Sequence, residues 1–459
     1  MPRLRTFSSR PMEAGLLAII SLIAVLGFAM TETALQVQRG ADPLPALPGA
    51  LAPALVLVAG LWAMHGLLRW QGVTGEQVLW PSAGLLLALG LILIWRLRPP
   101  EPGVWQQILR GFMPGLALAA LFITRPRLIE RLRCDWPMLI SLGGLALLLA
   151  TAFLGVRDEA GATLALKLGP LPAVQTSELI KLALIVFLAW YIDREVAFIE
   201  GRPCLLFGRL RLPPLQTFLP GGLFVGLASL ILLKMADWGN VLILACLFVA
   251  MLYAGLLHPR TFLAAGLTLT VVVGLLLAMV WSPPELIRAR FAAFLNPWST
   301  ASIVYNGHQT TISAGPGYQL QQAIYAANAG GLTGQGLGFG SPGNIPLAHS
   351  DAILAAIHEE LGLVTVLALL AVFLVLLLRI LRLAMMLPAG QVFERLLAIG
   401  IAAHLFTQLF VIAGGTYGLL PLTGVTAPFL SQGGMALMVN LAEIGLVLGL
   451  ARRLEGDPA

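Results

Sequence analysis

Residues 330–340 read Gly-Gly-Leu-Thr-Gly-Gln-Gly-Leu-Gly-Phe-Gly, and residues 345–362 read Ile-Pro-Leu-Ala-His-Ser-Asp-Ala-Ile-Leu-Ala-Ala-Ile-His-Glu-Glu-Leu-Gly. This glycine-rich stretch interrupts a chain of 459 residues that is 58% hydrophobic and 11% charged, with a mean hydropathy of +0.88. Because so few charges cannot cover a soluble protein, the composition predicts an all-α polytopic membrane protein. Irregular backbone at a membrane requires protein or water to satisfy its polar groups. We therefore expect the functional site within residues 281–376, around this stretch.

Apolar runs long enough to cross the hydrocarbon core, about twenty residues each, recur along the chain. They predict twelve spans, with approximate limits 13–30, 50–69, 80–96, 110–124, 138–156, 178–193, 217–234, 239–257, 260–281, 360–382, 395–416 and 434–452. The basic segment Met1–Arg10 precedes an apolar run without a small-residue cleavage site, which indicates a retained first span. Three cysteines (Cys134, Cys204 and Cys246) are too few and too scattered for a disulfide framework or a metal site, so free thiols are expected.

The basic residues predict the orientation of the chain. Most of the 28 Lys and Arg residues fall on one side when the N-terminus is cytoplasmic, which predicts that both termini are cytoplasmic. The predicted regions are an added two-helix segment (1–79), a membrane core (80–452) with a large loop outside the membrane (282–359), and a cytoplasmic tail (453–459). Two shorter irregular segments, Gly155–Ser177 and Gly414–Gly434, fall on the same outer side. We expect all three outer segments to converge on one outward-facing cavity.

Ionisable residues near the membrane are costly and often mark a site. Glu178 and Lys181 lie three residues apart and share a helix face, where they form either an internal ion pair or part of a site. Asp237 lies with Lys234 at a short turn between two spans, where snorkelling to the membrane surface is the alternative to a functional role.

A denser cluster of ionisable residues contains His349, Asp351, Glu359 and Glu360. The two glutamates are expected on a helix that continues directly into the next span. Ser350 or Asp351 is a candidate N-cap of that helix. A zinc site is not expected, because His349 and His358 are nine residues apart and no third ligand is suitably spaced.

Several motifs follow one another on the predicted outer side. They are Gln175-Thr-Ser-Glu-Leu-Ile-Lys181, Asp237-Trp-Gly-Asn240, Arg290 before Asn296-Pro-Trp298, Gly317-Tyr-Gln-Leu-Gln-Gln322, Gly330–Gly338, Ala348-His-Ser-Asp351, Glu359-Glu-Leu-Gly362, and Pro421-Leu-Thr-Gly424 through Pro428-Phe-Leu-Ser-Gln-Gly-Gly434. In these motifs and their order, the chain resembles the SEDS family, the FtsW/RodA/SpoVE type of peptidoglycan glycosyltransferase, over roughly residues 80–452. Members of that family commonly have ten spans, so the first two spans here look like an N-terminal addition without assigned chemistry.

The resemblance implies a multi-pass protein of the bacterial plasma membrane that polymerises lipid II during cell division or cell-shape maintenance. A sugar 4-hydroxyl would displace undecaprenyl diphosphate from an anomeric carbon, which requires a general base and cations for the diphosphate. The implied substrate-binding residues are Lys181, Glu178, Arg290, Tyr318, Gln319, Gln322, His349, Asp351, Glu360 and Ser431. The implied partners are lipid II and a single-span penicillin-binding transpeptidase, with no nucleic acid. No cofactor and no metal site are expected, although a divalent cation is compatible with the reaction.

The chain departs from the family at the presumed catalytic base. Family members carry an Asp shortly after the Asn-Pro-Trp motif, whereas Thr300 occupies this position here and residues 291–350 contain no Asp or Glu. A threonine hydroxyl cannot act as a general base near neutral pH. The candidate replacements are Asp351, Glu178 and Asp237. Three functions stay open: a polymerase with a different base, a catalytically silent relative that binds lipid-linked precursor or scaffolds the division or elongation machinery, and a flippase of a polyprenyl-linked precursor.

Overall fold

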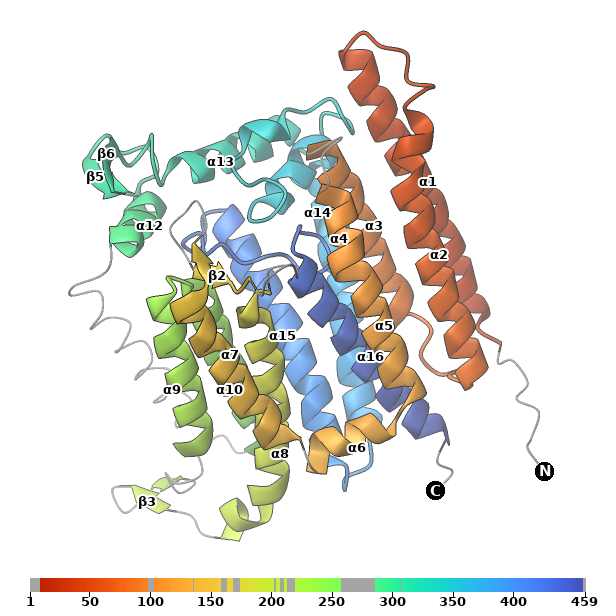
Figure 1. Ribbon diagram of the computed structural model, residues 1–459, viewed down its shortest axis with the longest axis vertical. Coiled ribbons are helices and arrows are strands. Elements are labelled where there is room, and N and C mark those ends of the chain that lie inside the picture. The colour runs from red at the N-terminus through yellow and green to blue at the C-terminus, as the bar shows by residue number, and fades with distance from the viewer. Residues whose placement is uncertain are drawn as a thin grey trace.

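Long helices side by side make up most of the computed structural model of the protein (Figure 1). The structure describes residues 9–97, 103–134, 136–157, 163–167, 174–201, 204–206, 210–212, 219–256, 285–305 and 307–456. The start of α1 and the end of α16, close to the first and last described residues, lie at one end of the helix bundle, which we call the termini end (Figure 1). Residues 285–351 lie across the opposite end, which we call the loop end.

The helical elements account for eleven of the twelve predicted spans. In chain order, all described helical elements, including the short ones that are not spans, are α1 (Pro11–Gln38), α2 (Leu47–Gln71), α3 (Leu79–Leu97), α4 (Gly103–Gln107), a π-helical turn η1 (Ile108–Phe112), α5 (Met113–Thr124), α6 (Arg127–Cys134), α7 (Pro137–Leu154), α8 (Thr176–Gly201), α9 (Leu219–Lys234), α10 (Trp238–Leu256), α12 (Glu285–Leu295), α13 (Tyr318–Gly330), a 3-10 turn η3 (Pro342–Asn344), α14 (Ile353–Met386), α15 (Val392–Thr416) and α16 (Gly434–Gly456). Among the described residues, nine helical segments are long and apolar enough to cross a membrane. Helices α8 and α9 occupy two further predicted spans, and the predicted span 260–281 lies outside the described residues. The protein is therefore a multi-pass, all-α membrane protein.

Some predicted boundaries are wrong by several residues. The fourth span begins at Gly103, because α4 and the π-helical turn η1 continue into α5. Helix α14 begins at Ile353 rather than near residue 360. Helix α16 continues to Gly456, into the predicted tail. Cys134 and Cys246 are free thiols, as predicted, and only the backbone of Cys204 is described.

Three short antiparallel hairpins occur in the described connections. They pair β1 (Val156–Arg157) with β2 (Thr163–Ala165), β3 (Cys204–Leu206) with β4 (Leu210–Leu212), and β5 (Ser302–Tyr305) with β6 (His308–Thr311). The β5–β6 hairpin lies at the loop end, beside α12 (Figure 1). Backbone bonds close its base, since Ile312 N–H donates to Ala301 (3.1 Å) and Ser313 N–H donates to Ser299 (3.0 Å).

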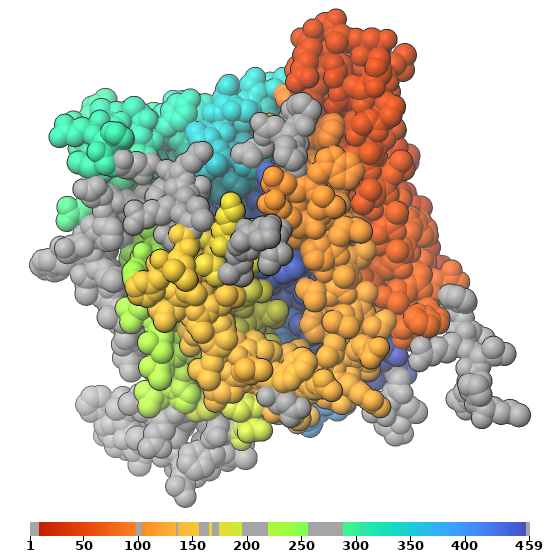
Figure 2. Space-filling model, viewed as in Figure 1, coloured from red at the N-terminus to blue at the C-terminus, as the bar shows by residue number. Residues whose placement is uncertain are grey.

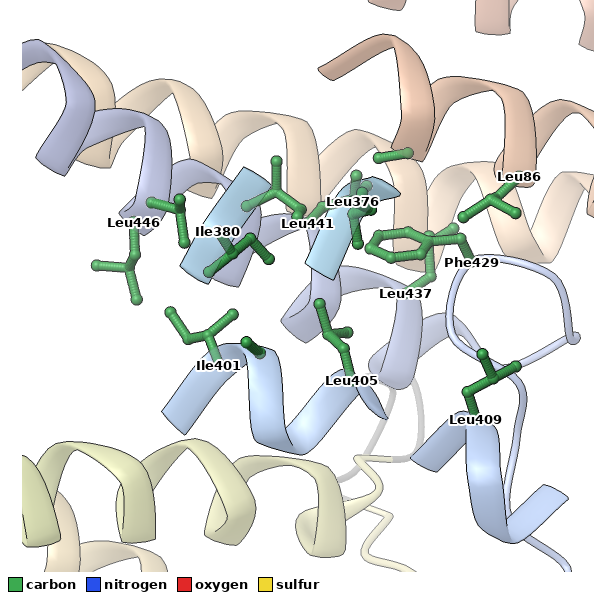
Figure 3. Packing of buried hydrophobic residues seen from close by; sticks show 14 of the residues in the cluster. Leu86, Leu376, Ile380, Ile401, Leu405, Leu409, Phe429, Leu437, Leu441 and Leu446 are labelled. Carbon is green, nitrogen blue, oxygen red and sulfur yellow. The ribbon is translucent and has the colours of Figure 1, made fainter. Parts of the chain in front are cut away.

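Apolar side chains fill the space between α3, α14, α15 and α16. Figure 3 shows Leu376, Ile401, Leu405 and Leu441 from the last three helices facing one another, and each is at most 1% exposed. Small residues let helices approach closely, as in other membrane bundles. A Cβ at Gly445 of α16 would overlap Ala119 of α5.

Glu359 and Glu360 lie on a helix, as predicted, but α14 is broken just after them, so the prediction that this helix continues directly into the next span is wrong. Gly362 has φ 80° and ψ 170°, which are not helical angles. The break would leave backbone groups unpaired at the edge of a span, which is costly without water. The glycine-rich loop, residues 331–341, supplies the missing partners.

Four backbone–backbone hydrogen bonds join this loop to α14. Gln335 and Gly336 N–H donate to the carbonyl oxygens of Glu359 and Glu360, each at 2.9 Å. In return, the N–H groups that follow the break, those of residues 363 and 364, donate to the carbonyl oxygens of residues 331 and 332, at 3.0 and 3.2 Å. The glycines permit this backbone-to-backbone approach, since a Cβ at Gly334 would overlap the carbonyl of Glu360.

We predict that Gly362→Ala destabilises the protein by about 2–5 kcal/mol, because the substitution adds left-handed strain and a clash in a packed site. A Cβ at Gly362 would meet the backbone of residues 332–334, whereas Gly343 has no atom within 4 Å of its would-be Cβ. Gly343→Ala is therefore the matched control, with an expected change of about 0.5 kcal/mol or less. Thermal unfolding in detergent measures both, and equal melting temperatures would contradict this account.

Candidate functional site

A cavity of ≈ 420 Å³ lies at the loop end, where the outer segments meet. Its lining comprises Gln175, Ala236, Asp237, Asn240, Arg290, Ala293, Phe294, Tyr305, Pro316, Gln319, Leu320, Leu347, His349, Ser350, Asp351, Leu422, Thr423, Gly424 and Thr426. These residues come from all three predicted outer segments and from the α9–α10 turn. The expected convergence on one cavity is confirmed.

Asp237 forms one wall of the cavity at the start of α10. The side chain is 5% exposed, and its carboxylate accepts hydrogen bonds from Asn240 Nδ2 (2.8 Å) and Asn240 N–H (3.4 Å). Burial raises the pKa of Asp237, although the Asn240 bonds and the nearby Lys181 act in the opposite direction. Ala236, directly before it, has φ 61°, a strained angle for a residue other than glycine. The turn thus holds a carboxyl group that is costly to ionise.

Glu178 and Lys181 form the internal ion pair that was one of the two interpretations of their spacing. Their charged groups lie 2.8 Å apart, and the side chains are 3% and 0% exposed. Neither residue lines the cavity. Lys181 nevertheless lies near enough to Asp237 to lower the pKa of that carboxyl group. Glu178 acts in the opposite direction and raises it, so the two charges of the pair oppose each other at Asp237.

Asp351 is half-buried and lines the cavity together with His349. Its carboxylate faces Gly424, since a Cβ on that glycine would lie 3.6 Å from Asp351 Oδ2. The predicted N-cap role of Ser350 or Asp351 is wrong, because α14 follows Ala352 and has no side-chain cap bond. Asp351 thus presents a carboxylate to the cavity.

Loop 427–432 fixes the segment that carries Asp351. The hydroxyl of Ser431 donates to the carbonyl of Ser350 (2.5 Å), and Gln432 N–H donates to the carbonyl of His349 (2.8 Å). Ser431 is 3% exposed and does not line the cavity. The structure therefore places this predicted substrate-binding residue behind the cavity wall, where it orients the wall.

Glu360 also lies away from the cavity. It is fully buried, and its carboxylate accepts from Arg96 Nε (2.8 Å) and from Gly338 N–H (3.1 Å). Glu359 accepts from Ser341 N–H (2.8 Å). Both glutamates therefore hold the glycine-rich loop in place. Of the four residues in the predicted cluster, His349 and Asp351 are the two that line the cavity.

The remaining predicted binding residues belong to α12 and α13. Arg290 lines the cavity, and its guanidinium donates to the carbonyl of Thr423 at 3.4 Å. Gln319 also lines the cavity and donates to the carbonyl of Pro346 at 3.0 Å. Tyr318, 42% exposed, and Gln322, half-buried, do not line it.

The β5–β6 hairpin contributes a cavity residue that the sequence analysis missed. Tyr305, at the end of β5, lines the cavity, whereas Thr300 is exposed and does not. The missed signal was the dipeptide Asn306-Gly307 between alternating residues, which is typical of a two-residue hairpin turn. The hairpin therefore brings an aromatic ring, and no carboxylate, to this side of the cavity.

A hollow runs along the side of the bundle between α5 and α7. Figure 2 shows side chains of α16, in blue, at the floor of this hollow. Several apolar side chains of these two helices are exposed, including Met113 and Leu121 of α5 and Leu142 and Leu149 of α7. The hollow is therefore compatible with an extended apolar chain.

In the described residues, no group of three His, Cys, Asp or Glu side chains is placed to hold a metal ion.

Comparison with known proteins gives one family. The sequence model FTSW_RODA_SPOVE, described as "Cell cycle protein", matches residues 76–456. The chain belongs to the FtsW/RodA/SpoVE family. The match starts after α2, so it does not include α1 or α2.

Individual members of the FtsW/RodA/SpoVE family are similar over most of the chain. A "Probable peptidoglycan glycosyltransferase FtsW" of Geobacter sulfurreducens is 36% identical over 286 residues, which are 62% of this chain and 69% of that protein. A "Peptidoglycan glycosyltransferase RodA" of Mycobacterium tuberculosis is 30% identical over 383 residues, 81% of this chain and 77% of that protein. A solved structure titled "Structural coordination of polymerization and crosslinking by a peptidoglycan synthase complex" matches with a TM-score of 0.63 and 25% identity, covering 82% of this chain and 97% of that one.

The buried carboxyl group of Asp237 predicts a pH-dependent stability. Its pKa is raised in the folded protein, so the folded state binds this proton more tightly than the unfolded chain. The stabilising contribution is fully present below the ordinary Asp value of 3.8 and is lost as pH rises through the folded-state pKa. Melting temperatures measured upward from pH 4 should show this decline, and Asp237→Asn should reduce it. Asp42→Asn, at an exposed site, is the control; an unchanged slope in Asp237→Asn would contradict the assignment.

Proposed function

We propose that this protein is a peptidoglycan glycosyltransferase that polymerises lipid II into glycan strands, in cell division or in cell-shape maintenance. The single observation that carries the proposal is the cavity in which the Asp351 carboxylate and the Arg290 guanidinium line the same ≈ 420 Å³ space. The named activity of the similar FtsW and RodA proteins supports the same reaction class.

Asp351 is assigned as the general base. Among the described residues that line the cavity, the carboxylates are those of Asp237 and Asp351. Asp237 is 5% exposed, whereas Asp351 is half-buried at the cavity wall and so more accessible. A base must reach the proton that it removes, so the more accessible carboxylate suits the role better. Glu178 does not line the cavity and is paired with Lys181.

The proposed reaction is a direct displacement. The 4-hydroxyl oxygen of the acceptor sugar forms a bond to the anomeric carbon of the donor sugar. The bond from that carbon to the diphosphate oxygen breaks, so undecaprenyl diphosphate leaves with the electron pair. Asp351 takes the hydroxyl proton. Within this step, positioning and charge stabilisation supply the remaining rate enhancement.

Arg290 is the cation assigned to the diphosphate. Its planar guanidinium suits phosphate oxygens, and it lines the cavity next to Thr423, whose carbonyl accepts a hydrogen bond from it. Lys181 has no exposed surface on its side chain and acts through Glu178 and Asp237 instead. Arg288 is exposed and does not line the cavity. The lipid tail is assigned to the lateral hollow between α5 and α7 (Figure 2).

The proposal includes a location and a partner. The protein lies in the bacterial plasma membrane with both termini in the cytoplasm, so the loop end faces outward, where glycan strands form. A single-span penicillin-binding transpeptidase is the proposed partner, and the similarity to a complex of polymerization and crosslinking supports it. The reaction itself requires no cofactor.

A catalytically silent relative is the second candidate function. The observation in its favour is that the β5–β6 hairpin and its flanks carry no carboxylate and that Thr300 lies outside the cavity. Such a protein would bind lipid II or organise a synthase complex without transferring sugars. A flippase of the lipid-linked precursor would instead move substrate across vesicles without lengthening glycan.

We predict that Asp351→Asn lowers lipid II polymerisation about 10²- to 10⁴-fold, because it removes the base and keeps the side-chain shape. Purified protein with labelled lipid II, assayed with and without a cognate transpeptidase, measures the products. Asp237→Asn and Glu178→Gln run alongside, with exposed Asp42→Asn as the control. Retained activity in Asp351→Asn and lost activity in Asp237→Asn would move the base to Asp237. Lipid II binding without product in the unaltered protein would favour the silent relative.

A second prediction concerns the diphosphate. Arg290→Gln should weaken lipid II binding about 10- to 100-fold, since a hydrogen bond to a charged group contributes about 1.5–3 kcal/mol. Arg288→Gln is the matched control, because Arg288 lies one helical half-turn away on α12 and is exposed. Binding can be followed by fluorescence anisotropy of labelled lipid II. Equal affinities for the two variants would refute the role of Arg290.

A further inference from the structure

The helical hairpin α1–α2 is an element of this chain beyond the family match, which begins at residue 76. Figure 1 shows α1 and α2 along one flank of the bundle, over its full height. Helix α1 packs mainly on α2 and α3, and α2 packs also on α5. Both ends of this hairpin make polar contacts with the core, and each set of contacts leads to α14.

We propose that α1–α2 is an intramolecular brace that positions the outward site, with Gln38 as its positioning residue at the loop end. The effect on catalysis rests on the proposed function, whereas the mechanical effect does not. The proposal follows from the contacts at the two ends and from the place of the glycine-rich loop between two cavity walls.

At the loop end, α1 holds Gly338 of the glycine-rich loop. Gln38 Nε2 donates to the Gly338 carbonyl at 2.6 Å. Ala34 lies so close that a Cβ on Gly338 would overlap it, and φ of this glycine is 88°. The same carbonyl accepts from Arg96 (3.2 Å), the residue that pairs with Glu360. Gln38 therefore helps to hold the glycine-rich loop in the position where its backbone bonds to α14 at the break.

A second contact from α1 supports the Arg96 segment of α3. The indole N–H of Trp95 donates to Glu32 at 3.0 Å, and Gln36 donates to the other oxygen of Glu32 at 2.6 Å. Glu32 is 6% exposed, so this carboxylate is held inside the hairpin–core interface. The contact fixes α3 next to the arginine that binds the loop.

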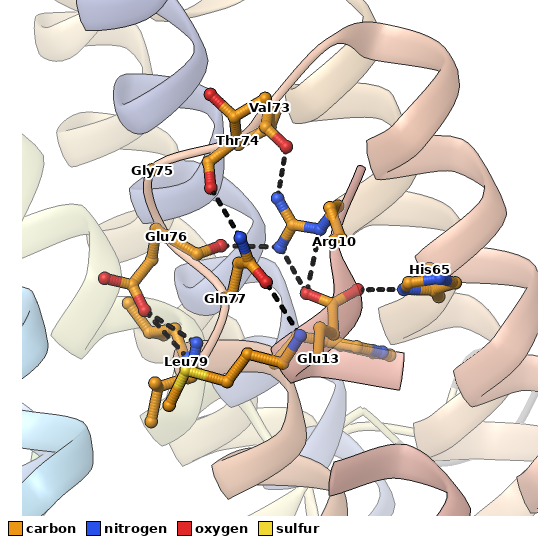
Figure 4. A network of polar contacts seen from close by, with 12 residues as sticks. Arg10, Glu13, His65, Val73, Thr74, Gly75, Glu76, Gln77 and Leu79 are labelled. Carbon is orange, nitrogen blue, oxygen red and sulfur yellow. Dashed lines mark hydrogen bonds and ion pairs between the residues drawn. The ribbon is translucent and has the colours of Figure 1, made fainter. Parts of the chain in front are cut away.

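At the termini end, buried Arg10 links the hairpin to the next connection (Figure 4). Arg10 donates to Glu13 and to the carbonyl oxygens of Val73 and Glu76, while Glu13 also pairs with His65 at 2.6 Å. The Glu76 carboxylate pairs with Arg379 of α14 at 3.0 Å. The brace thus connects to the start of α14 at one end and to its last turns at the other.

The glycine-rich loop transmits this restraint to the cavity. It lies in the chain between two segments that line the cavity, namely Gln319 and Leu320 before it and residues 347 and 349–351 after it. Backbone bonds from residues 350 and 351 to the carbonyl of Leu347 continue the restrained segment, each at 3.0 Å. A loosened loop would therefore shift the Asp351 carboxylate, and catalysis is sensitive to such displacements.

Gln38→Leu tests the brace, because it keeps the size of the side chain and removes the donor. Amide hydrogen exchange of residues 331–341 and 350–351 in the full-length protein should become about five- to tenfold faster. Lipid II polymerisation should show a kcat lowered about tenfold with KM changed less than twofold. Gln38→Lys, which keeps a donor, should restore both properties. Val37→Ala, at an exposed position on the same turn, is the control and should match the unaltered protein.

Unchanged exchange in Gln38→Leu would overturn the brace. Faster exchange of residues 331–341 that does not extend to residues 350–351, or that leaves kcat unaltered, would overturn its positioning role. If the unaltered protein makes no glycan, the proposed function fails, and hydrogen exchange alone then decides the proposal: residues 331–341 test the brace and residues 350–351 test its positioning role.

Discussion

The break of α14 at Gly362 is the constraint on which the outward half of the structure depends. Backbone groups at the edge of a membrane span require partners, and the glycine-rich loop supplies them through its own N–H and C=O groups. Only glycines allow two backbones to approach in this way, as the overlap at Gly334 demonstrates. The buried Arg96–Glu360 pair then fixes the loop against α3. In the chain, the loop leads to Leu347 and residues 349–351, which line the cavity, so its bonds to α14 also restrain the backbone that carries Asp351.

This arrangement separates residues that shape the cavity from residues that face it. Glu360 and Ser431 hold backbone segments, whereas the carboxyl group of Asp351 and the guanidinium of Arg290 belong to residues that line the cavity. A sugar-transfer site needs both classes, since preorganised groups stabilise a transition state without further rearrangement. The α1–α2 hairpin extends this preorganisation to a flank of the protein that the family match does not include.

The sequence predicts the spans because apolar composition over about twenty residues is a local property. The convergence of the outer segments was also predictable, since the basic residues place them on one side. The roles of individual residues were not, because they depend on distant partners: Arg96 and Glu360 are 264 positions apart. Similarly, Asp351 and Glu360 are only nine residues apart, and the sequence does not reveal that the first lines a cavity whereas the second lies in the protein interior. The β5–β6 hairpin was predictable from its turn dipeptide, but the contact of Tyr305 with the cavity required the fold.

We propose that the reacting sugars bind in one cavity, between Asp351 and Arg290. Electron cryo-microscopy of the full-length protein with bound lipid II would show this arrangement. We expect a sugar hydroxyl within hydrogen-bond distance of the Asp351 carboxylate and a diphosphate against the Arg290 guanidinium. Carbohydrate density outside this cavity, or a reacting hydroxyl beside a different carboxylate, would contradict it.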